Sequence, residues 1–256
     1  MDFYAASCAA NMYDGPKRER HLDYEPDEAA IRARAMRGPI SQRLEVIADD
    51  FRQRLGDYSR AIDNLVDRLM HSEAGRTAPD VGDMFPDFVL PDSAGKLWRL
   101  EQALTEGPVI LAFHRGYWCD FCHLNMAALA ELGPKAKALG AQIVAISPQN
   151  AASGRKLLRD SGAQFPLLCD VGLGVSSMLG LAYAVDDDIR RELALLQIDL
   201  NAENCGDGWL MPIAATFVVD VSGKVFARHL DPDPRKRMDG DEILQAAANC
   251  HSAARS

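Results

Sequence analysis

Two cysteines that stand close together are the first candidates for chemistry in this sequence. Cys119 and Cys122 lie in the segment VILAFHRGYWCDFCHLNMAAL, where a short apolar run leads through a loop into a predicted helix. Free N–H groups and the positive dipole end at a helix start stabilise a thiolate, and the first-turn Cys119 should benefit most. Cys122 follows one turn later on the same face, at a spacing that permits a disulfide. We predict that the pair cycles between dithiol and disulfide.

Three further residues are candidates for supporting this pair. Arg115 either adds positive charge near the thiolates or is a solvated loop residue. Trp118 is expected to cover the pair and limit solvent, and Thr216 lies where a later hairpin should approach the disulfide. Ordinary packing is the alternative for both of these side chains.

Metal-dependent interpretations of the same motif are weaker. CDFCH has the C-x-x-C-H spacing of covalent haem attachment, but that attachment normally requires export, and a buried strand leads directly into the pair. His123 is therefore expected on the helix surface. Zinc is a minor alternative, since Cys169, Cys205 and His114 form no second close pair of ligands. We predict neither a cofactor nor a metal.

The remaining cysteines receive different expectations. The chain has six cysteines in 256 residues, too few and too scattered for a disulfide framework. Cys205, in the loop NAENCGDGW, is either an additional resolving thiol or an ordinary loop thiol. Cys169 ends a predicted strand and is expected to pack in the core. Cys8 and Cys250 lie near the termini and are assigned no role.

The segment before the cysteine pair predicts helix. Residues 1–38 mix charges of both signs with few apolar anchors and are expected to form a loosely ordered arm. Residues 39–75 are predicted to be a helical segment, because apolar residues then recur at steps of three and four: Leu44, Ile47, Phe51, Leu55, Tyr58, Ile62, Leu65 and Leu69. Gly56 is a candidate break in this helix. Either the following domain or a second copy of the chain must cover the apolar stripe.

Residues 76–256 alternate between strand and helix signals. Buried strands are predicted at 109–114, 142–147 and 165–169, and the turns DSAG and VSGK predict two hairpins, the second joining 216–220 to 225–229. Helices are predicted at about 119–139, 151–161, 175–181, 188–198 and 241–251. This order implies an α/β fold with a mixed central sheet and helices on both faces.

The composition excludes several classes of protein. With 28 Lys plus Arg against 37 Asp plus Glu, the net charge of −9 argues against a nucleic-acid partner. The longest apolar run, 108–113, is far shorter than the roughly 20 residues that cross a bilayer. The start MDFYAASCAANMYD lacks the features of a secretory signal, so we expect no membrane association and a cytoplasmic location.

Several segments together resemble a known family. The strand–RGYWCDFC–helix unit, VGDMFPDFVLPDSAGK, AISPQ, FPLLCDVG, FVVDVSGKV and HLDPDPRKR are similar to the peroxiredoxin-like branch of the alkyl hydroperoxide reductase/thiol-specific antioxidant (AhpC/TSA) family. The resemblance spans roughly Pro39 to Ala248. It implies a thioredoxin-like fold, a hydroperoxide substrate, a thioredoxin-like reductant and a homodimer. It also leaves Asp231, Asp233, Arg235 and Arg237 as a solvated loop or a dimer contact.

The signature residues depart from the family pattern. In the peroxiredoxin signature P-x-x-x-T-x-x-C, Arg115 takes the Pro position, Cys119 the Thr position and Cys122 that of the attacking cysteine. In thioredoxins the first cysteine of the pair attacks, so the two resemblances nominate different nucleophiles. Ala214 stands where thioredoxin-like proteins have a cis-Pro and peroxiredoxins an Arg. A resolving cysteine five residues after the attacking one would fall at Ala127.

Three functions follow as hypotheses. The first is a thiol-dependent peroxidase in which Cys122 attacks a hydroperoxide and Cys119 closes a disulfide that thioredoxin or a similar dithiol reduces. The second is a protein disulfide oxidoreductase in which Cys119 attacks and Cys122 resolves. The third is a non-enzymatic redox sensor or an interaction module that presents the amphipathic helix 41–70.

Overall fold

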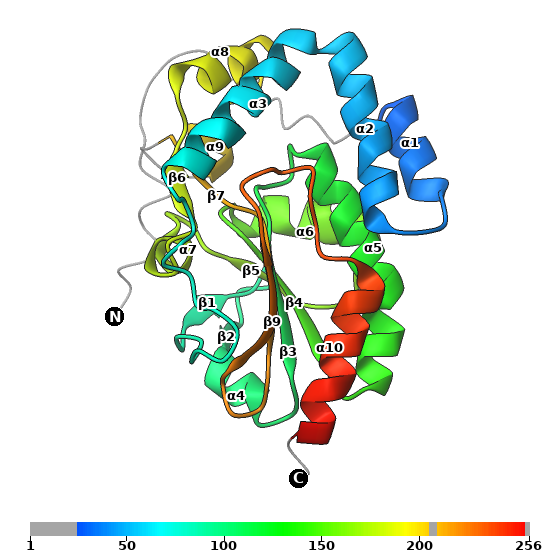
Figure 1. The fold of residues 1–256 in the computed structure, drawn as a ribbon, viewed down its shortest axis with the longest axis vertical. Coiled ribbons are helices and arrows are strands. Elements are labelled where there is room, and N and C mark those ends of the chain that lie inside the picture. Colours follow the sequence, from blue (N-terminus) through cyan, green and yellow to red (C-terminus); the bar gives the residue numbers. More distant parts are fainter. Residues whose placement is uncertain (1–24, 205–208, 254–256) are drawn as a thin grey trace.

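A five-stranded mixed sheet lies at the centre of the chain (Figure 1). The computed structural model describes residues 25–204 and 209–253. The sheet consists of β5 (Leu167–Cys169), β4 (Gln142–Ser147), β3 (Val109–Phe113), β8 (Ala215–Val219) and β9 (Val225–Leu230), in that spatial order. β3, β4 and β5 are parallel, and β8 runs antiparallel to both β3 and β9. The predicted thioredoxin-like α/β fold is confirmed.

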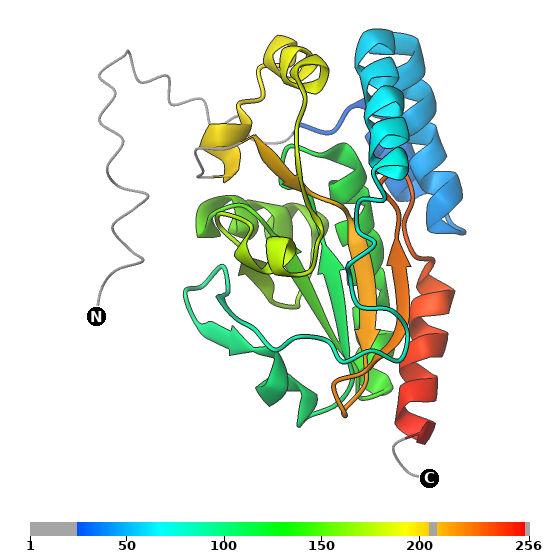
Figure 2. The same ribbon diagram turned by 60° about the vertical axis from the view of Figure 1, so that its left-hand side comes forward.

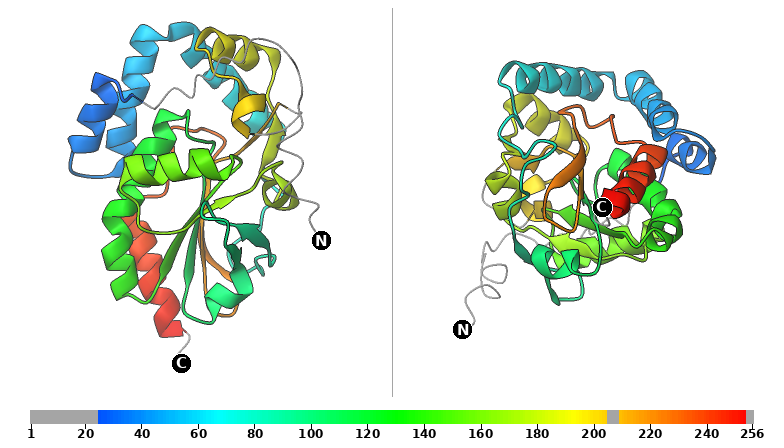
Figure 3. Two further views of the ribbon diagram at one scale, coloured as in Figure 1. Left: turned by 180° about the vertical axis from the view of Figure 1, so that it is seen from behind. Right: turned by 60° about the horizontal axis from the view of Figure 1, so that its bottom comes forward.

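Layers on both faces bury the central strands. One face carries α5 (Asp120–Ala138), α6 (Ala151–Ser161) and α10 (Gly240–Ala253), and Figure 3 shows α5 and α10 side by side. The other face carries β1 (Val89–Pro91), β2 (Leu97–Arg99), α4 (Leu100–Leu104) and α7 (Gly174–Met178). In β3, Ile110 packs against the first layer and Leu111 against the second. A strand covered on both faces is apolar at every position, as β3 is.

Two N-terminal helices lie across the end of the sheet at which β3 finishes (Figures 1 and 2). The apolar stripe forms α2 (Ile40–Arg54) and α3 (Gly56–His71) rather than one continuous helix. Leu55, between them, has φ −126° and ψ 49°, which ends the first helix beside the expected Gly56 break. The stripe packs within the chain, against α5 and α8 (Asp187–Leu195).

The expected loose arm contains a helix within its described part. α1 (Glu28–Ala35) begins after Asp27, whose carboxylate accepts the backbone N–H of Ala30 at 2.8 Å. The small apolar face of Ala29, Ala30 and Ala33 is buried. The mixture of charges concealed this helix, because its anchoring side chains are alanines. Its start is fixed by Asp27, which caps the helix and pairs with Arg54.

The hairpin predictions are confirmed, and one small sheet was not predicted. β1 pairs with β2 across DSAG, and β8 pairs with β9 across VSGK. An additional antiparallel pair joins β6 (Ala182–Ala184) to β7 (Leu210–Pro212), and α9 (Leu200–Asn204) lies between them in sequence. Within the described ranges, no helix has the length and apolar character required to cross a membrane.

Candidate active site

The end of β3 and the start of α5 place the two predicted cysteines together. A short loop after Phe113 leads to Cys119, which is the N-cap residue of α5. The carbonyl oxygen of Cys119 accepts the backbone N–H groups of Cys122 at 2.9 Å and His123 at 3.0 Å. Both cysteines are free thiols, with Cys119 3% and Cys122 0% exposed. The pair is therefore a buried dithiol one helical turn long.

A glycine makes the loop before the pair possible. Gly116 has φ +142°, a conformation that other residues rarely adopt. A Cβ at this position would lie 2.9 Å from Cδ of Gln149 and 2.9 Å from Nε1 of Trp118. The Gln149 side chain in turn accepts the backbone N–H of Tyr117 at 2.5 Å. The tight turn thus brings Arg115, Trp118 and Cys119 to the same end of the sheet.

The sulfur of Cys122 lies in an environment that favours its ionised form. The backbone N–H of Arg115 points at Cys122 Sγ at 3.4 Å, and Nη2 of Arg237 lies 3.8 Å from it. Burial alone would raise the pKa of Cys122, but a hydrogen bond from the Cys119 thiol, the adjacent His114 imidazole and the Arg237 charge hold that pKa well below its usual value. Neither ring nitrogen of His114 has a hydrogen-bond partner of ordinary geometry.

Cys119 is affected in the opposite direction. Burial raises the pKa of Cys119, and so does the hydrogen bond that its S–H donates to Cys122. The expectation that Cys119 benefits most from the helix start is therefore wrong. Its position as N-cap brings no hydrogen bond from the helix to its side chain, whereas Cys122 collects the available donors. The surroundings of the pair therefore favour the thiolate at Cys122 rather than at Cys119.

Arg115 is a buried cation beside the pair, and its interpretation as a solvated loop residue is wrong. Its side chain is 2% exposed, its Nε donates to Met211 Sδ at 2.8 Å, and its guanidinium lies 4.8 Å from the centre of the Trp118 ring. Burial alone would lower the pKa of Arg115, but Tyr183 and Cys119 raise it, so the group stays charged. Among the described residues, its Nη2 has no hydrogen-bond partner.

Arg237 is the site residue that the sequence interpretation missed. It was expected in a solvated loop, yet its side chain is 6% exposed. Its Nη1 donates to the carbonyl oxygens of Pro234 at 2.6 Å and Lys236 at 2.7 Å, which fixes the guanidinium while Nη2 points at Cys122. The basic run RKR after the last strand was the sequence signal for a cationic residue near the site. It does not show which of its residues turns inward.

The other predicted residues have mixed outcomes. Trp118 is half-buried and stacks on Arg115, and within the described part of the chain its Nε1 has no hydrogen-bond partner. Thr216 is buried in β8 between Ala112 and His229, and the structure gives it no hydrogen bond to either cysteine within its described residues. His123 is buried rather than on the helix surface, because its Nε2 pairs with the Tyr117 carbonyl oxygen at 2.6 Å.

Other cysteines and possible ligands lie elsewhere. Cys169 is buried at the end of β5, and Cys250 is buried in α10, where burial raises its pKa to about 12. Cys8 and Cys205 lie outside the described residues. Across residues 25–204 and 209–253, no three His, Cys, Asp or Glu side chains gather as a metal site would require.

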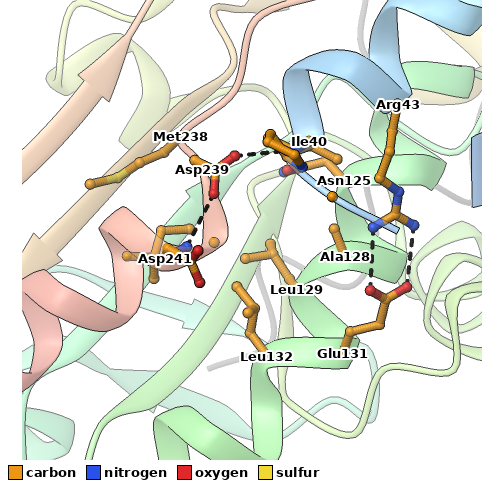
Figure 4. A pocket seen from close by; sticks show the side chains of 14 residues that line it. Ile40, Arg43, Asn125, Ala128, Leu129, Glu131, Leu132, Met238, Asp239 and Asp241 are labelled. Atoms are coloured by element: carbon orange, nitrogen blue, oxygen red, sulfur yellow. Dashed lines mark hydrogen bonds and ion pairs between the residues drawn. The ribbon is translucent and has the colours of Figure 1, made fainter. Parts of the chain in front are cut away.

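Several cavities lie near the cysteine-bearing helix. The first, of about 310 Å³, reaches Cys119 and Arg115 beneath α2 and α3. The second, of about 280 Å³, lies between α2, α5 and α10 (Figure 4). In the second cavity Arg43 pairs with Glu131, and Asp239 accepts the backbone N–H of Ile40. It contains neither cysteine, whereas the first cavity reaches Cys119 and is therefore the candidate substrate site.

The chain matches the AhpC/TSA family over residues 81–228, which is more than half of its length. Among curated proteins, a thiol-disulfide oxidoreductase ResA of Geobacillus kaustophilus is 31% identical over 151 residues, covering 59% of this chain and 69% of the relative. A putative peroxiredoxin of Mycobacterium tuberculosis is 28% identical over 145 residues, covering 56% of this chain and 80% of the relative.

Solved structures give the same fold. The peroxidoxin BcpB from Mycobacterium tuberculosis superposes with a TM-score of 0.53 at 24% identity, covering 70% of this chain and 99% of that one. A mutant of peroxiredoxin 6 from Arenicola marina gives 0.55 at 19% identity, covering 69% and 76%. By the family match, the shared fold and the similarity to thiol oxidoreductases, the chain belongs to the AhpC/TSA family and has a thiol-dependent redox function.

Proposed function

We propose that the protein is a thiol-dependent peroxidase in which Cys122 attacks the hydroperoxide. The observation that carries this proposal is the asymmetry of the pair. The hydrogen-bond donors converge on Cys122, and the thiol of Cys119 is one of them. The Cys122 thiolate attacks the outer peroxide oxygen, the O–O bond breaks, and the alkoxide leaves as an alcohol after protonation. Cys122 becomes a sulfenic acid.

Cys119 completes the oxidative half of the cycle. Its sulfur displaces the hydroxyl group of the Cys122 sulfenic acid, which releases water and forms the Cys119–Cys122 disulfide. An external dithiol, of which thioredoxin is the predicted example, then reduces this disulfide. Arg237 stabilises the attacking thiolate, and the Arg115 backbone N–H holds it in place. Cys205 is proposed as an additional resolving thiol.

A protein disulfide oxidoreductase is the second candidate, favoured by the similarity to ResA proteins. That function requires Cys119 to be the attacking thiolate, exposed to a partner protein. The raised pKa of Cys119 opposes this role. Reduction of insulin disulfides that is lost in Cys119→Ser, with a mixed disulfide trapped in Cys122→Ser, would establish the second candidate instead.

The interaction-module hypothesis required an exposed apolar face on the helical segment 41–70. In the structure, the apolar face of α2 and α3 packs on α5 and α8. A cytoplasmic location and a homodimer remain predictions. Light scattering of the purified chain tests whether it is a homodimer. A dimer must use a surface other than the covered apolar stripe of α2 and α3. Fractionation of cells that express the full chain tests the cytoplasmic location.

Mass spectrometry after one equivalent of cumene hydroperoxide tests the proposed chemistry. The wild type should lose two hydrogen atoms and show a peptide linked through Cys119 and Cys122. Cys119→Ser should stop at a Cys122 sulfenic acid that dimedone traps, and Cys122→Ser should not be oxidised at this site. Cys250→Ser is the matched control, because that thiol is buried in α10. Peroxide turnover by Cys122→Ser at the wild-type rate would refute the assignment.

A further inference from the structure

The guanidinium of Arg115 is held by a sulfur atom and an aromatic ring. Its Nε donates to Met211 Sδ at 2.8 Å, and its Cζ lies 4.8 Å from the centre of the Trp118 ring. Within the described residues Arg115 forms no ion pair with Asp or Glu. Buried charges are normally paired with an opposite charge. A thioether and an indole ring hold the guanidinium without neutralising it, because both are uncharged.

The small sheet of β6 and β7 builds this contact. Tyr183 and Met211 are direct cross-strand partners in that sheet. The Tyr183 hydroxyl donates to Met211 Sδ at 3.2 Å, so the sulfur accepts one hydrogen bond from the neighbouring strand and one from Arg115. Met211 is 0% exposed and packs in the apolar cluster that also contains Cys119 and Cys122. The sulfur atom is therefore fixed in place, and it fixes the direction of the guanidinium.

The side chain of Arg115 lies on the Cys119 side of the pair. Arg115 and Cys119 line the first cavity, of about 310 Å³, whereas Cys122 is not among its lining residues. Nη2 of Arg115 is buried and has no hydrogen-bond acceptor in the described part of the chain. The other arginine of the site, Arg237, directs its Nη2 at Cys122 Sγ at 3.8 Å. Each sulfur of the pair therefore has a guanidinium on its own side.

The resolving step is the step in which Cys119 needs a cation. Burial and the hydrogen bond to Cys122 raise the pKa of Cys119, so that it is a thiol at neutral pH. The attack of Cys119 on the sulfenic acid requires the thiolate. The charge of Arg115 acts against burial and favours that thiolate. An arginine without a carboxylate partner is suited to this task, because its charge is not already compensated.

Other charged and titratable groups also surround Cys119. They are Tyr58, Asp120, Cys122, Tyr183 and Arg237, with Glu25, Asp27 and Arg54 at the same cavity. Only Arg54, Arg115 and Arg237 among them are cations. Arg54 pairs with Asp27, and Arg237 points at Cys122. Arg115 is therefore the cation that can respond to a negative charge forming on Cys119.

We propose that Met211 and Tyr183 position Arg115 so that its guanidinium stabilises the Cys119 thiolate while the disulfide closes. Cys119 loses its proton, its sulfur attacks Sγ of the Cys122 sulfenic acid, and the S–O bond breaks. The departing hydroxide takes up a proton and leaves as water. Met211 and Tyr183 act through Arg115 and are positioning residues. The proposal rests on the peroxidase function above and assigns the Arg115 side chain to its second step.

Rapid-quench mass spectrometry of the full chain with cumene hydroperoxide separates the two steps. The sulfenic acid has gained one oxygen atom, and the disulfide has lost two hydrogen atoms. Met211→Leu keeps the approximate size of the side chain and removes the sulfur. We expect sulfenic acid formation within about twofold of the wild type and closure of the disulfide slowed about fivefold at neutral pH, the order of one net hydrogen bond. The slowing should diminish in strongly alkaline buffer, where Cys119 is ionised in both proteins.

Met126→Leu is the matched control, because Met126 is also 0% exposed but packs in a different apolar cluster. Tyr183→Phe, which removes the second donor to Met211, should slow closure in the same direction. Arg115→Met should slow closure at least as much as Met211→Leu does. Adding Met211→Leu to Arg115→Met should then have no further effect, since the two residues act through one contact.

Three results would overturn the proposal. They are closure at the wild-type rate in Met211→Leu, equal slowing in Met126→Leu, and additive effects of Met211→Leu and Arg115→Met. A slowing of Met211→Leu that is the same at every pH would show a structural effect and would also overturn it. If the wild type forms neither sulfenic acid nor disulfide with the hydroperoxide, the peroxidase function itself has failed, and the proposal fails with it.

Discussion

At the scale of single residues, one turn of helix separates two thiols of opposite character. Cys122 accepts a backbone N–H and lies next to a guanidinium and a neighbouring thiol, whereas Cys119 donates its S–H in a hydrogen bond, keeps its proton and is shielded by burial. The motif alone predicted a redox pair but not the order of its members. That order depends on Arg237, which lies 115 positions along the chain from Cys122.

Replacing Arg237 by glutamine should raise the pKa of Cys122, because it removes a positive charge that favours the thiolate. The pKa of the wild-type Cys122 thiol is lowered, so its thiolate persists as pH falls. In the variant this thiolate should become protonated at a higher pH than in the wild type. Absorbance of the thiolate near 240 nm in Cys119→Ser backgrounds measures this.

The rate of sulfenic acid formation should fall with Arg237→Gln at the acidic pH values where the thiolate fraction of Cys122 falls. Arg235→Gln provides the control, because Arg235 pairs with Asp63 and Asp233 on the other side of the segment. An unchanged titration of Cys122 in Arg237→Gln would show that the arginine acts only on packing.

His123 should make the fold sensitive to acid. Burial lowers the pKa of His123 to about 4, against about 6.5 in the unfolded chain, so folding favours the neutral ring. The resulting stability is complete above pH 6.5 and is lost as pH falls toward 4. Between pH 7 and 4.5 the free energy of unfolding should fall by about 2 kcal/mol from this residue. Urea unfolding of His123→Gln should lack that part of the decrease, and identical pH dependence would contradict the assignment.

At the scale of elements, the periodicity of apolar residues identified α2 and α3 but not the helices on which they pack. The stripe from Leu44 to Leu69 predicted helix correctly, and Gly56 marked the break. What the period could not give was the partner of the stripe. Packing against α5 and α8 depends on side chains that are far apart in sequence, such as Phe51 and Phe121.

Gly56→Ala should stabilise the protein by about 0.5 kcal/mol, since the position begins α3, has open space around a Cβ, and avoids left-handed backbone. Gly107→Ala is the opposing comparison. Gly107 has φ +152°, and a Cβ there would lie 2.1 Å from the Gly140 carbonyl oxygen, so unfolding should occur at lower urea concentration. A destabilised Gly56→Ala protein would show that the break is strained.

Phe51→Ala should loosen the cover over the cysteines. The Phe51 ring packs edge to face on Phe121 at 5.3 Å, between α2 and the turn that bears the pair. Removing this buried ring should cost about 3 kcal/mol of stability and accelerate labelling of the thiols by an aromatic disulfide reagent. Met70→Ala, at a position 59% exposed on α3, should change stability by less than about 0.5 kcal/mol. Equal labelling rates in both variants would contradict the role of the cover.

At the scale of the whole molecule, the sheet was predictable and the enclosure of the site was not. Short apolar runs and turn residues are local signals, so β3, β4 and the two hairpins appear in the sequence itself. The helices α2 and α3 cover the cysteines by packing on α5 and α8. Arg237, in the segment after β9, turns inward to Cys122. These contacts join distant parts of the chain, and no local pattern records them.

The distance along the chain between Cys122 and Arg237 has a consequence for biosynthesis. A ribosome releases the cysteine pair long before the last strand and the segment 231–237 can dock. Until then Cys122 lacks this guanidinium. On the proposed peroxidase function, Cys122 therefore gains its full reactivity only after the segment 231–237 has docked, which would spare the growing chain early oxidation at this thiol.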